Sequence, residues 1–417
     1  RPRVTRRRET SVALDGIIVN IARCISDSTI PIIYTRHRGR VMLVARLALI
    51  VFFVALVARY YHPRTGFTAL INFDESGHEF ESQTLQRTVH FHYPGKASYD
   101  GQFYAQLAMD PLLREPDTDY LMDMAPFRAR RVLFSMTAYC LGLGRPAWIL
   151  QVYSLQNVLA WLLLAWWLAR RLPHDTVRGL LVWAACLFTQ GLLASVRVAV
   201  LDGPSLLLIA LAITAAEKGH IKTAAAIVGV SVLGRETNLL AAAALFPIVL
   251  AMGRRPRWWT LAACSLLLVL PELLWLDYLR SIYRSTVLAH GPSLGVPLAA
   301  FAAQWDRVIH GTFFTFGPNA IWRSPGALVL VSLTVQAAGL LIRPNIRSPL
   351  WCTGAVFAGL MLLVSDHVWG GEPGATPRVV LPLTLAFNLT LPRGRAFWPW
   401  WLAGNLAVIP GVMALLS

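Results

Sequence analysis

The chain has 417 residues, of which 56% are hydrophobic and 14% are charged. Soluble domains carry roughly a quarter charged residues, so this composition excludes an ordinary soluble domain and favours a membrane protein. The formal net charge is +16, but the basic residues fall in short clusters between apolar runs, as they do in cytoplasmic loops. They form no single stripe along the sequence, and we expect no nucleic-acid partner.

The N-terminal region, residues 1–40, is predicted to be a basic, amphipathic lead-in on the cytoplasmic side. Up to Arg46 the chain has ten arginines against three acidic residues, and such an excess of positive charge is typical of the cytoplasmic flank of a first span. Charged residues and a proline interrupt residues 11–35, so this stretch is not apolar enough to cross a bilayer. We place the first transmembrane helix at 41–60.

Residues 61–146 are predicted to form a large external loop that carries short juxtamembrane or re-entrant helices. Between residues 61 and 127 there are ten acidic and four basic residues, and this negative balance beside a positive lead-in favours the opposite side of the membrane. We interpret the apolar stretch 128–144 as a short embedded or re-entrant helix, because a full crossing would invert all later loops. A full crossing with the parity restored elsewhere remains the alternative.

The whole pattern predicts an all-α polytopic membrane protein with about 11 transmembrane helices, in a range of about 11 to 13. A transmembrane bundle occupies 147–278, an external loop with an interfacial helix 279–324, and C-terminal transmembrane helices 325–417. Basic loops recur at every second junction, so the alternation is self-consistent. Within the second external loop the amphipathic stretch 293–312 is expected to lie along the membrane interface. The predicted spans after the first are 147–169, 178–197, 203–216, 221–235, 238–252, 258–278, 325–342, 350–365, 378–391 and 397–416.

In this topology, ionisable residues at the ends of distant spans collect on the external face. Such residues are costly in a membrane unless they are paired or face water, so they mark functional sites. A carboxylate there can take a proton from a hydroxyl nucleophile, while guanidinium groups hold a departing phosphate. The residues concerned include Asp100, Asp110, Arg128, Arg130, Arg131, Arg197, Asp202, Arg235, Glu236, Asp366, His367, Glu372 and Arg378.

Asp100 is the strongest candidate for a catalytic base. It lies in "ASYDGQFYAQLAMDP", with Tyr99, Phe103 and Tyr104 around it, at the start of a predicted short helix. Its carboxylate could cap that helix, but capping does not require aromatic neighbours. Flanking rings suit a sugar face or a lipid headgroup boundary, and partial desolvation would raise the basicity of the carboxylate.

Several other charged residues have simple structural interpretations beside the functional one. Asp202 precedes Gly203-Pro204 and is interpreted as the N-cap of the next span. Arg235 and Glu236 in "GRETN" are either an ordinary helix-terminus pair or part of a site. The three arginines that open the apolar stretch after residue 127 either snorkel to lipid headgroups or bind phosphate.

We predict no metal site and no cofactor. The five cysteines are scattered and show no metal-binding spacing. His90 and His92 in "HFHYP" alternate as on a strand and can face the same way, but no third ligand stands at a set spacing. A divalent cation held by Asp100 with Asp74 or Glu75 is the alternative, which we do not favour.

The sequence resembles the GT-C class of integral-membrane glycosyltransferases and, more narrowly, a bacterial group associated with cell-surface glycopolymer formation. The resemblance covers about residues 97–391. It rests on "YDGQFYAQLAMDP" and "PFRARRVLFSM", followed by "LDGPSLLLIALA", "GRETNLL" and "PRVVLPLTLAF". It implies a GT-C-like fold with a large first external loop.

The resemblance also implies roles for individual residues. Asp100 becomes the catalytic base, although Asp74-Glu75 is the alternative, because many relatives have a paired-acid signature where this chain has a single acid. The residues expected to bind the donor phosphate are Arg128, Arg131, Arg235 and Arg378. Those expected to contact the acceptor or the sugar are Tyr99, Gln102, Tyr104, Glu236, His367 and Glu372.

The implied reaction is an inverting transfer of a sugar from a polyprenyl-phosphate carrier to a glycan or glycolipid acceptor. We expect a monomer among membrane lipids in a bacterial inner membrane, with its active site in the periplasm. One alternative is a glycan polymerase or ligase that uses lipid diphosphate-linked chains. Another is a non-enzymatic lipid or solute transporter, which would place ionisable groups near the bilayer midplane and show matching broken helices in two halves.

Overall fold

The computed structural model describes residues 39–75, 81–95, 99–114, 122–252, 258–283, 293–310, 325–370 and 375–416. The described chain is mostly helical, and its strands form one two-stranded sheet. Nearly all of the predicted lead-in 1–40 lies outside the described residues, as do Glu372 and much of the predicted loop 279–324.

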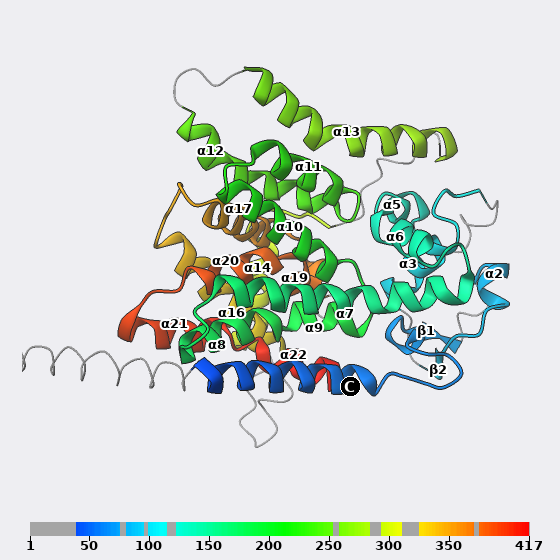
Figure 1. The fold of residues 1–417 in the computed structure, drawn as a ribbon, viewed down its shortest axis with the longest axis horizontal. Coiled ribbons are helices and arrows are strands. Elements are labelled where there is room, and N and C mark those ends of the chain that lie inside the picture. The colour runs from blue at the N-terminus through cyan, green and yellow to red at the C-terminus, as the bar shows by residue number, and fades with distance from the viewer. Residues whose placement is uncertain are drawn as a thin grey trace, which may run out of the picture.

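The helices after residue 145 form the body of the protein, and the segment between residues 61 and 145 lies at one end of it (Figure 1). Several consecutive helices of the body are joined by short described turns and pack side by side, as α7 does with α8 and α10 with α11. Their bounds are α7 (Pro146–Arg171), α8 (Val177–Leu187), α9 (Gln190–Arg197), α10 (Asp202–Glu217), α11 (Ile221–Val232), η3 (Glu236–Leu245), α12 (Phe246–Ala251), α13 (Trp258–Tyr283), α14 (Ala299–His310), α16 (Pro325–Leu341), α17 (Pro349–Leu363), α18 (Asp366–Gly370), α19 (Ala375–Val379), α20 (Leu381–Leu389), η6 (Gly394–Ala396), α21 (Phe397–Gly404) and α22 (Val408–Leu416).

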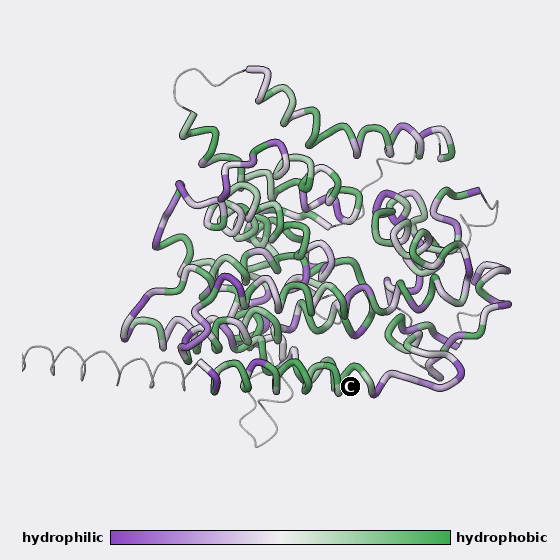
Figure 2. Tube along the Cα trace, in the orientation of Figure 1, coloured by the Kyte–Doolittle hydropathy of each residue, from purple (hydrophilic) through white to green (hydrophobic). Residues whose placement is uncertain are grey.

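Three helices among the described residues are long and apolar enough to cross a membrane: Gly39–Ala58, α7 and α13. At 1.5 Å per residue the 26 residues of α13 extend about 39 Å, more than the roughly 30 Å of a bilayer core. The first helix and α13 are largely hydrophobic along their length (Figure 2), and the most apolar window of α13 is only 6% buried inside the protein. Because so much of α13 is apolar and exposed, a lipid environment suits it.

Two bent helix pairs raise the number of candidate spans to five if each pair is one span. The predicted spans at 203–216, 221–235, 325–342 and 350–365 are helices too, but each is shorter than the roughly 20 residues that cross a bilayer core. The predicted span 238–252 is divided into a 3₁₀ helix, η3, and the short α12. The prediction of about 11 spans therefore stays a prediction.

The two bent pairs contact each other at their breaks. Helices α8 and α9 meet at 47°, and the helices η6–α21 and α22 meet at 42°. The amide of Gln190 at the first break donates to the carbonyl of Ala407 at the second, at 3.1 Å. A Cβ at Gly411 would lie 2.5 Å from the carbonyl oxygen of Phe188. Backbone groups freed by a break must find partners inside an apolar body, and here the breaks supply them to each other.

Aromatic residues tie the first helix to α7 and α8. The rings of Phe53 and Trp161 stack with centroids 3.7 Å apart. Both indole N–H groups in this layer are satisfied, since Trp161 donates to the carbonyl of Leu187 and Trp183 to that of Ala165, each at 2.8 Å. Buried indoles need such partners, so these contacts fix how the three helices pack.

The segment 61–145 contains short elements packed around α3. In chain order they are η1 (Thr68–Leu70), β1 (Phe73–Asp74), α2 (Gln83–Gln86), β2 (His92–Tyr93), α3 (Asp100–Met109), α5 (Ala125–Ala129) and α6 (Leu133–Leu141). Strands β1 and β2 pair in parallel. The predicted embedded stretch 128–144 contains the end of α5 and the nine-residue α6, which at about 14 Å is too short to cross a bilayer. The predicted interfacial helix within 293–312 is α14, which has polar and apolar faces.

Candidate functional site

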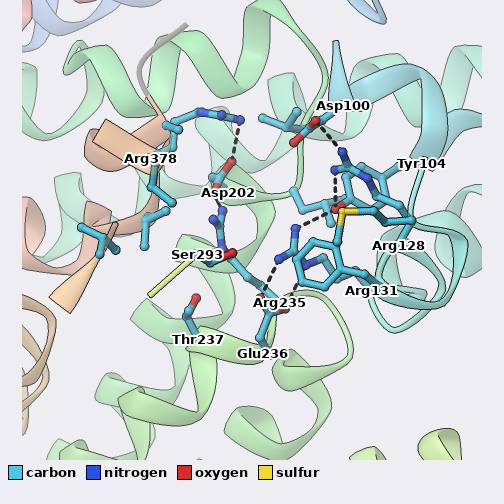
Figure 3. Close-up of a pocket in the computed structure, with 18 of the residues that line it drawn as sticks. Asp100, Tyr104, Arg128, Arg131, Asp202, Arg235, Glu236, Thr237, Ser293 and Arg378 are labelled. Atoms are coloured by element: carbon cyan, nitrogen blue, oxygen red, sulfur yellow. Dashed lines mark hydrogen bonds and ion pairs between the residues drawn. The ribbon is translucent and has the colours of Figure 1, made fainter. Parts of the chain in front are cut away.

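A cavity of about 370 Å³ lies where the segment 61–145 meets the body of the protein. Its walls come from α3, α5 and the turn after α5, from the starts of α10 and η3, and from α17, α18 and α19. Figure 3 shows the charged side chains of both sides turned toward one another. The residues predicted from sequence that line it are Tyr99, Asp100, Tyr104, Arg128, Arg131, Arg235, Glu236, His367 and Arg378.

Asp100 is the first residue of α3, and the N-cap position is taken by Tyr99, whose side chain makes no capping hydrogen bond. The Asp100 carboxylate accepts instead from Arg128, with Nη2 and Oδ1 2.9 Å apart. The capping interpretation of Asp100 is therefore wrong. The carboxylate is 34% exposed, which leaves it accessible from the cavity.

Gly101 sets the position of Asp100 against the body. A Cβ at Gly101 would lie 2.2 Å from the carbonyl oxygen of Val198 and 3.0 Å from that of Ile71. Only glycine permits this approach of two backbones. The start of α3 is thus pressed against the turn that precedes α10.

That turn is held by a network of buried polar groups. Tyr153 donates to the carbonyl of Ala199 at 2.8 Å, where the backbone has a positive φ of 43°. Asn157 donates to the carbonyl of Val200 at 2.8 Å, and Ser195 accepts from the amide of Gly203 at 2.9 Å. Because the turn is satisfied inside the protein, it presents the next residue, Asp202, in a defined position.

Asp202 is a site residue that the sequence did not assign. It is 3% exposed, and the N-cap position of α10 belongs to Leu201, so the interpretation of Asp202 as an N-cap is wrong. Its carboxylate forms an ion pair with Arg235, and its Oδ2 lies 3.4 Å from Nη1 of Arg378. A charged residue at the end of a predicted span was the available signal, but its two partners lie far along the chain.

Arg235 and Glu236 of "GRETN" do not pair with each other. Arg235 turns to Asp202, while Glu236 accepts from Nε and Nη2 of Arg131 at 2.8 and 2.5 Å. Such a two-pronged contact is among the strongest that a guanidinium makes. The helix-terminus-pair interpretation is wrong because both side chains take partners from other elements.

Arg128 and Arg131 also converge on one tyrosine. The hydroxyl of Tyr104 lies 2.8 Å from Nη1 of Arg131 and 3.4 Å from Nη1 of Arg128. Arg128 contacts Asp123 as well, with Nε and Oδ1 3.0 Å apart. Both arginines are 8% exposed, so the snorkelling interpretation fails for them, while Arg130 pairs with Glu272 of α13 at 2.9 Å.

Tyr99, which precedes Asp100, contacts Arg378 on α19. Its hydroxyl contacts Nη2 of Arg378, and its ring lies 5.1 Å from the centre of that guanidinium. Burial raises the pKa of Tyr99, and the charge of Arg378 opposes this rise. The phenol therefore stays protonated and can donate a hydrogen bond to a ligand oxygen.

The electrostatics of Asp100 differ from those expected from sequence. Burial would raise the pKa of Asp100, but the charge and hydrogen bond of Arg128, with the charges of Arg378 and Arg131, outweigh burial and hold the pKa below its ordinary value. The expectation of raised basicity by desolvation is thus wrong for this arrangement. Asp100 is therefore ionised at neutral pH.

Among the described residues that line the cavity, carboxylates and guanidinium groups are equal in number. In a cluster balanced in this way the carboxylates hold the guanidinium groups in place when no ligand is bound. A guanidinium can then exchange a carboxylate partner for a ligand phosphate. The eight residues are Asp100, Asp123, Asp202, Glu236, Arg128, Arg131, Arg235 and Arg378.

The remaining predicted residues lie elsewhere. Gln102 does not line the cavity, and neither do Asp74 on β1 and Glu75 after it. Of the carboxylates that the sequence offered as the base, Asp100 therefore lines the cavity and Asp74 and Glu75 do not. Glu372 lies outside the described residues.

No protein-family model matches the chain, and no curated protein matches it either. The function must therefore be argued from the cavity itself.

Proposed function

We propose that this chain is an inverting glycosyltransferase with a GT-C-like arrangement of about 11 spans in a bacterial inner membrane. It moves a sugar from a polyprenyl-phosphate carrier to a glycan or glycolipid acceptor in a site that opens to the periplasm. The observation that carries the proposal is that Asp100 and four arginines from distant segments line one cavity. A base beside several phosphate-binding groups is what this displacement requires.

The donor fits the two kinds of wall around the cavity. The guanidinium groups can bind a phosphate through paired N–H donors, and the ring of Tyr99 before α3 can contact a sugar face. The apolar wall suits the first isoprene units of a lipid carrier. Its apolar residues include Met124, Phe127, Leu201, Leu294, Leu360, Val364, Val368 and Val379.

The displacement uses Asp100 as the base. Asp100 takes the proton of the acceptor hydroxyl, the hydroxyl oxygen forms a bond with C1 of the sugar, and the bond from C1 to the phosphate oxygen breaks. The phosphate leaves with the bonding electrons and gains negative charge, which arginines already in place can stabilise. No proton has to reach the leaving group.

Arg128 supplies the coupling between donor binding and base strength. In the structure it pairs with Asp100 and keeps the pKa of that carboxyl low. A donor phosphate competes for the same guanidinium, and once Arg128 turns to the phosphate, Asp100 loses the strongest charge that lowers its pKa, so the pKa rises. Asp100 thereby becomes a better base when a donor is bound.

The bent helix pairs bear on the transporter alternative. Broken helices in transporters point their free ends at a substrate near the bilayer midplane. Here the two breaks pack against each other through Gln190, Ala407 and Gly411, and none of these residues lines the cavity. The breaks therefore favour a structural role.

A density map of the full chain in a lipid nanodisc with farnesyl phosphate, a short polyprenyl phosphate, tests the proposal. We expect the phosphate within hydrogen-bonding distance of Arg128 or Arg378 and beside Asp100. A phosphate bound outside the cavity would contradict the proposal. Tighter binding of farnesyl diphosphate than of farnesyl phosphate would favour the polymerase or ligase alternative instead.

A further inference from the structure

A second buried cluster lies in the segment 61–145, outside the cavity. It consists of Glu81, His90 and His92, whose three candidate ligand atoms all lie within 4.8 Å of one another. Oε1 of Glu81 is 3.1 Å from Nε2 of His90 and 2.8 Å from Nε2 of His92. The Glu81 and His90 side chains are 3% and 2% exposed, and that of His92 is 24% exposed.

The backbone holds these three side chains from two sides. His90 and His92 are two residues apart on extended chain, so their side chains point the same way, and their rings lie 4.2 Å apart. Glu81 precedes Ser82, the N-cap of α2, and the amide of Ser82 donates to Oε1 of Gln106 on α3 at 3.2 Å. The backbone next to Glu81 is thus fixed to α3, while His92 lies on β2.

The hydrogen bond between His90 and the backbone determines the tautomer of the neutral His90 ring. Nδ1 of His90 lies 2.6 Å from the carbonyl oxygen of Thr88, and a carbonyl can only accept, so Nδ1 carries a proton. In a neutral ring the lone pair of Nε2 then faces a carboxylate oxygen. Two acceptors in contact require a positive species between them, and a histidine whose outer N–H donates to a backbone carbonyl is typical of metal ligands.

We propose that Glu81, His90 and His92 bind one zinc ion. Zinc bonds of about 2.0–2.1 Å in a tetrahedron place ligand atoms roughly 3.4 Å apart, so the observed 3.1 and 2.8 Å need only a small expansion. Two imidazoles favour a transition metal over magnesium or calcium, which prefer oxygen ligands. The partial exposure of His92 lets the ion enter and lets a water complete its coordination.

The role of this ion is structural. The ring of Phe73 on β1 is fully buried and contacts the ring of His90 edge-on at 4.5 Å, so the cluster is shielded from water on that side. A metal here would join the β1–β2 sheet to the residue before α2, and through Ser82 to α3. This proposal does not depend on the proposed function, because the cluster shares no residue with the cavity.

Zinc titration of the full chain tests the proposal. The chain is purified in detergent with a tag that contains no histidine, stripped with EDTA, and titrated with zinc against a chromophoric chelator. We expect one tightly bound zinc per chain and a higher midpoint of thermal unfolding with zinc than without. Glu81→Gln and His90→Gln should each lose this zinc, whereas His220→Gln, at an exposed histidine, should keep it.

X-ray absorption of the zinc-loaded wild type keeps the test decisive where a variant fails to fold. We expect scattering from two imidazoles and from oxygen ligands in a four-coordinate site. The proposal is overturned if the wild type binds no zinc at micromolar concentration, if the absorption shows no imidazole, or if folded Glu81→Gln retains the ion. In the first case the cluster is an imidazolium–carboxylate group held by protons.

Discussion

Two buried clusters of ionisable side chains are connected by one short helix, α3. The cavity cluster joins residues up to 279 positions apart, as in the contact of Tyr99 with Arg378. The Glu81–His90–His92 cluster joins residues no more than 11 positions apart. Asp100 begins α3, and Gln106 near its end accepts from the amide beside Glu81.

The two clusters differ in what they leave free. In the cavity cluster the carboxylate of Asp100 stays partly exposed beside a space of about 370 Å³, so a ligand can replace one partner by another. In the second cluster the carboxylate is almost fully buried, and the Phe73 ring packs against His90. The first arrangement suits an exchangeable substrate, and the second suits a permanently bound ion. Substitutions in the two clusters should therefore change different properties.

The largest expected effect is that of Asp100→Asn. An amide cannot accept the acceptor's proton, so transfer should fall by about 10²–10⁴-fold in a protein that still folds. Release of polyprenyl phosphate from a panel of short polyprenyl-phosphate sugars, with a membrane glycolipid extract as acceptor, measures the loss. Asp123→Asn is the matched control, because Asp123 also pairs with Arg128 but is 53% exposed; it should reduce transfer far less. Full turnover by folded Asp100→Asn would remove Asp100 as the base.

Arg378→Ala should weaken phosphate binding. Its guanidinium is 6% exposed and faces the cavity, and hydrogen bonds to a charged group contribute about 1.5–3 kcal/mol each, or roughly 10–100-fold in affinity. Titration with farnesyl phosphate measures this effect, with Arg347→Ala, an exposed arginine between α16 and α17, as the control. Equal affinity in Arg378→Ala and wild type would place the phosphate elsewhere.

Gly101→Ala tests the packing of α3, the helix that connects the two clusters, against the body of the protein. The added methyl group meets the Val198 carbonyl oxygen at 2.2 Å, and such overpacking costs about 1–3 kcal/mol of unfolding free energy. We expect a lower thermal midpoint together with weaker transfer, since α3 must shift. Gly359→Ala, where a Cβ meets no atom within 4 Å, should be as stable as wild type. A Gly101→Ala protein of wild-type stability would show that α3 is not held as described.

The smallest expected effect is a change in pH dependence caused by Arg128→Ala. In the wild type the pKa of Asp100 lies below its ordinary value of 3.8, so the base is ionised at neutral pH. Protonation of Asp100 should therefore not lower kcat/KM as the pH falls from about 8 to about 4. Without Arg128 the strongest lowering charge is lost and the pKa of Asp100 rises, so the acid limb of kcat/KM should move to higher pH.

The same ion pair contributes to stability in a defined pH range. Because the folded-state pKa of Asp100 is lowered, its contribution is present above about pH 4 and is lost as the pH falls through the folded-state value. Thermal midpoints of wild type and Arg128→Ala should therefore converge in acid. Identical profiles of kcat/KM and of stability in the two proteins would contradict the electrostatic role of Arg128.

The sequence predicted the helical class and the residues around Asp100 because both signals are local. Apolar runs between basic clusters indicate membrane helices, and the stretch from Tyr99 to Tyr104 carries aromatic and acidic residues together. Nine predicted site residues line the cavity. Charged residues at the ends of membrane helices are costly unless they are paired or face a polar cavity, which explains why most of them collect at one site. Their chemical roles stay predictions.

The partners of these residues came only from the tertiary structure. Asp202 looked like an N-cap and Arg235–Glu236 like a pair, because local rules are all that neighbouring residues provide. Packing of α3, α10 and η3 instead assigns Asp202 to Arg235 and Arg378, and Glu236 to Arg131. The direction of the shift in the pKa of Asp100 also depends on Arg128, 28 residues away in the chain.

The histidine pair shows the same division. Alternation along an extended strand placed His90 and His92 on one side, and their adjacent rings confirm this prediction. The third group, Glu81, follows no fixed spacing, because a turn and α2 bring it back beside the strand. Periodicity in a sequence reports which way side chains point along one element, whereas a site needs the distances between elements, and those arise only when the elements pack.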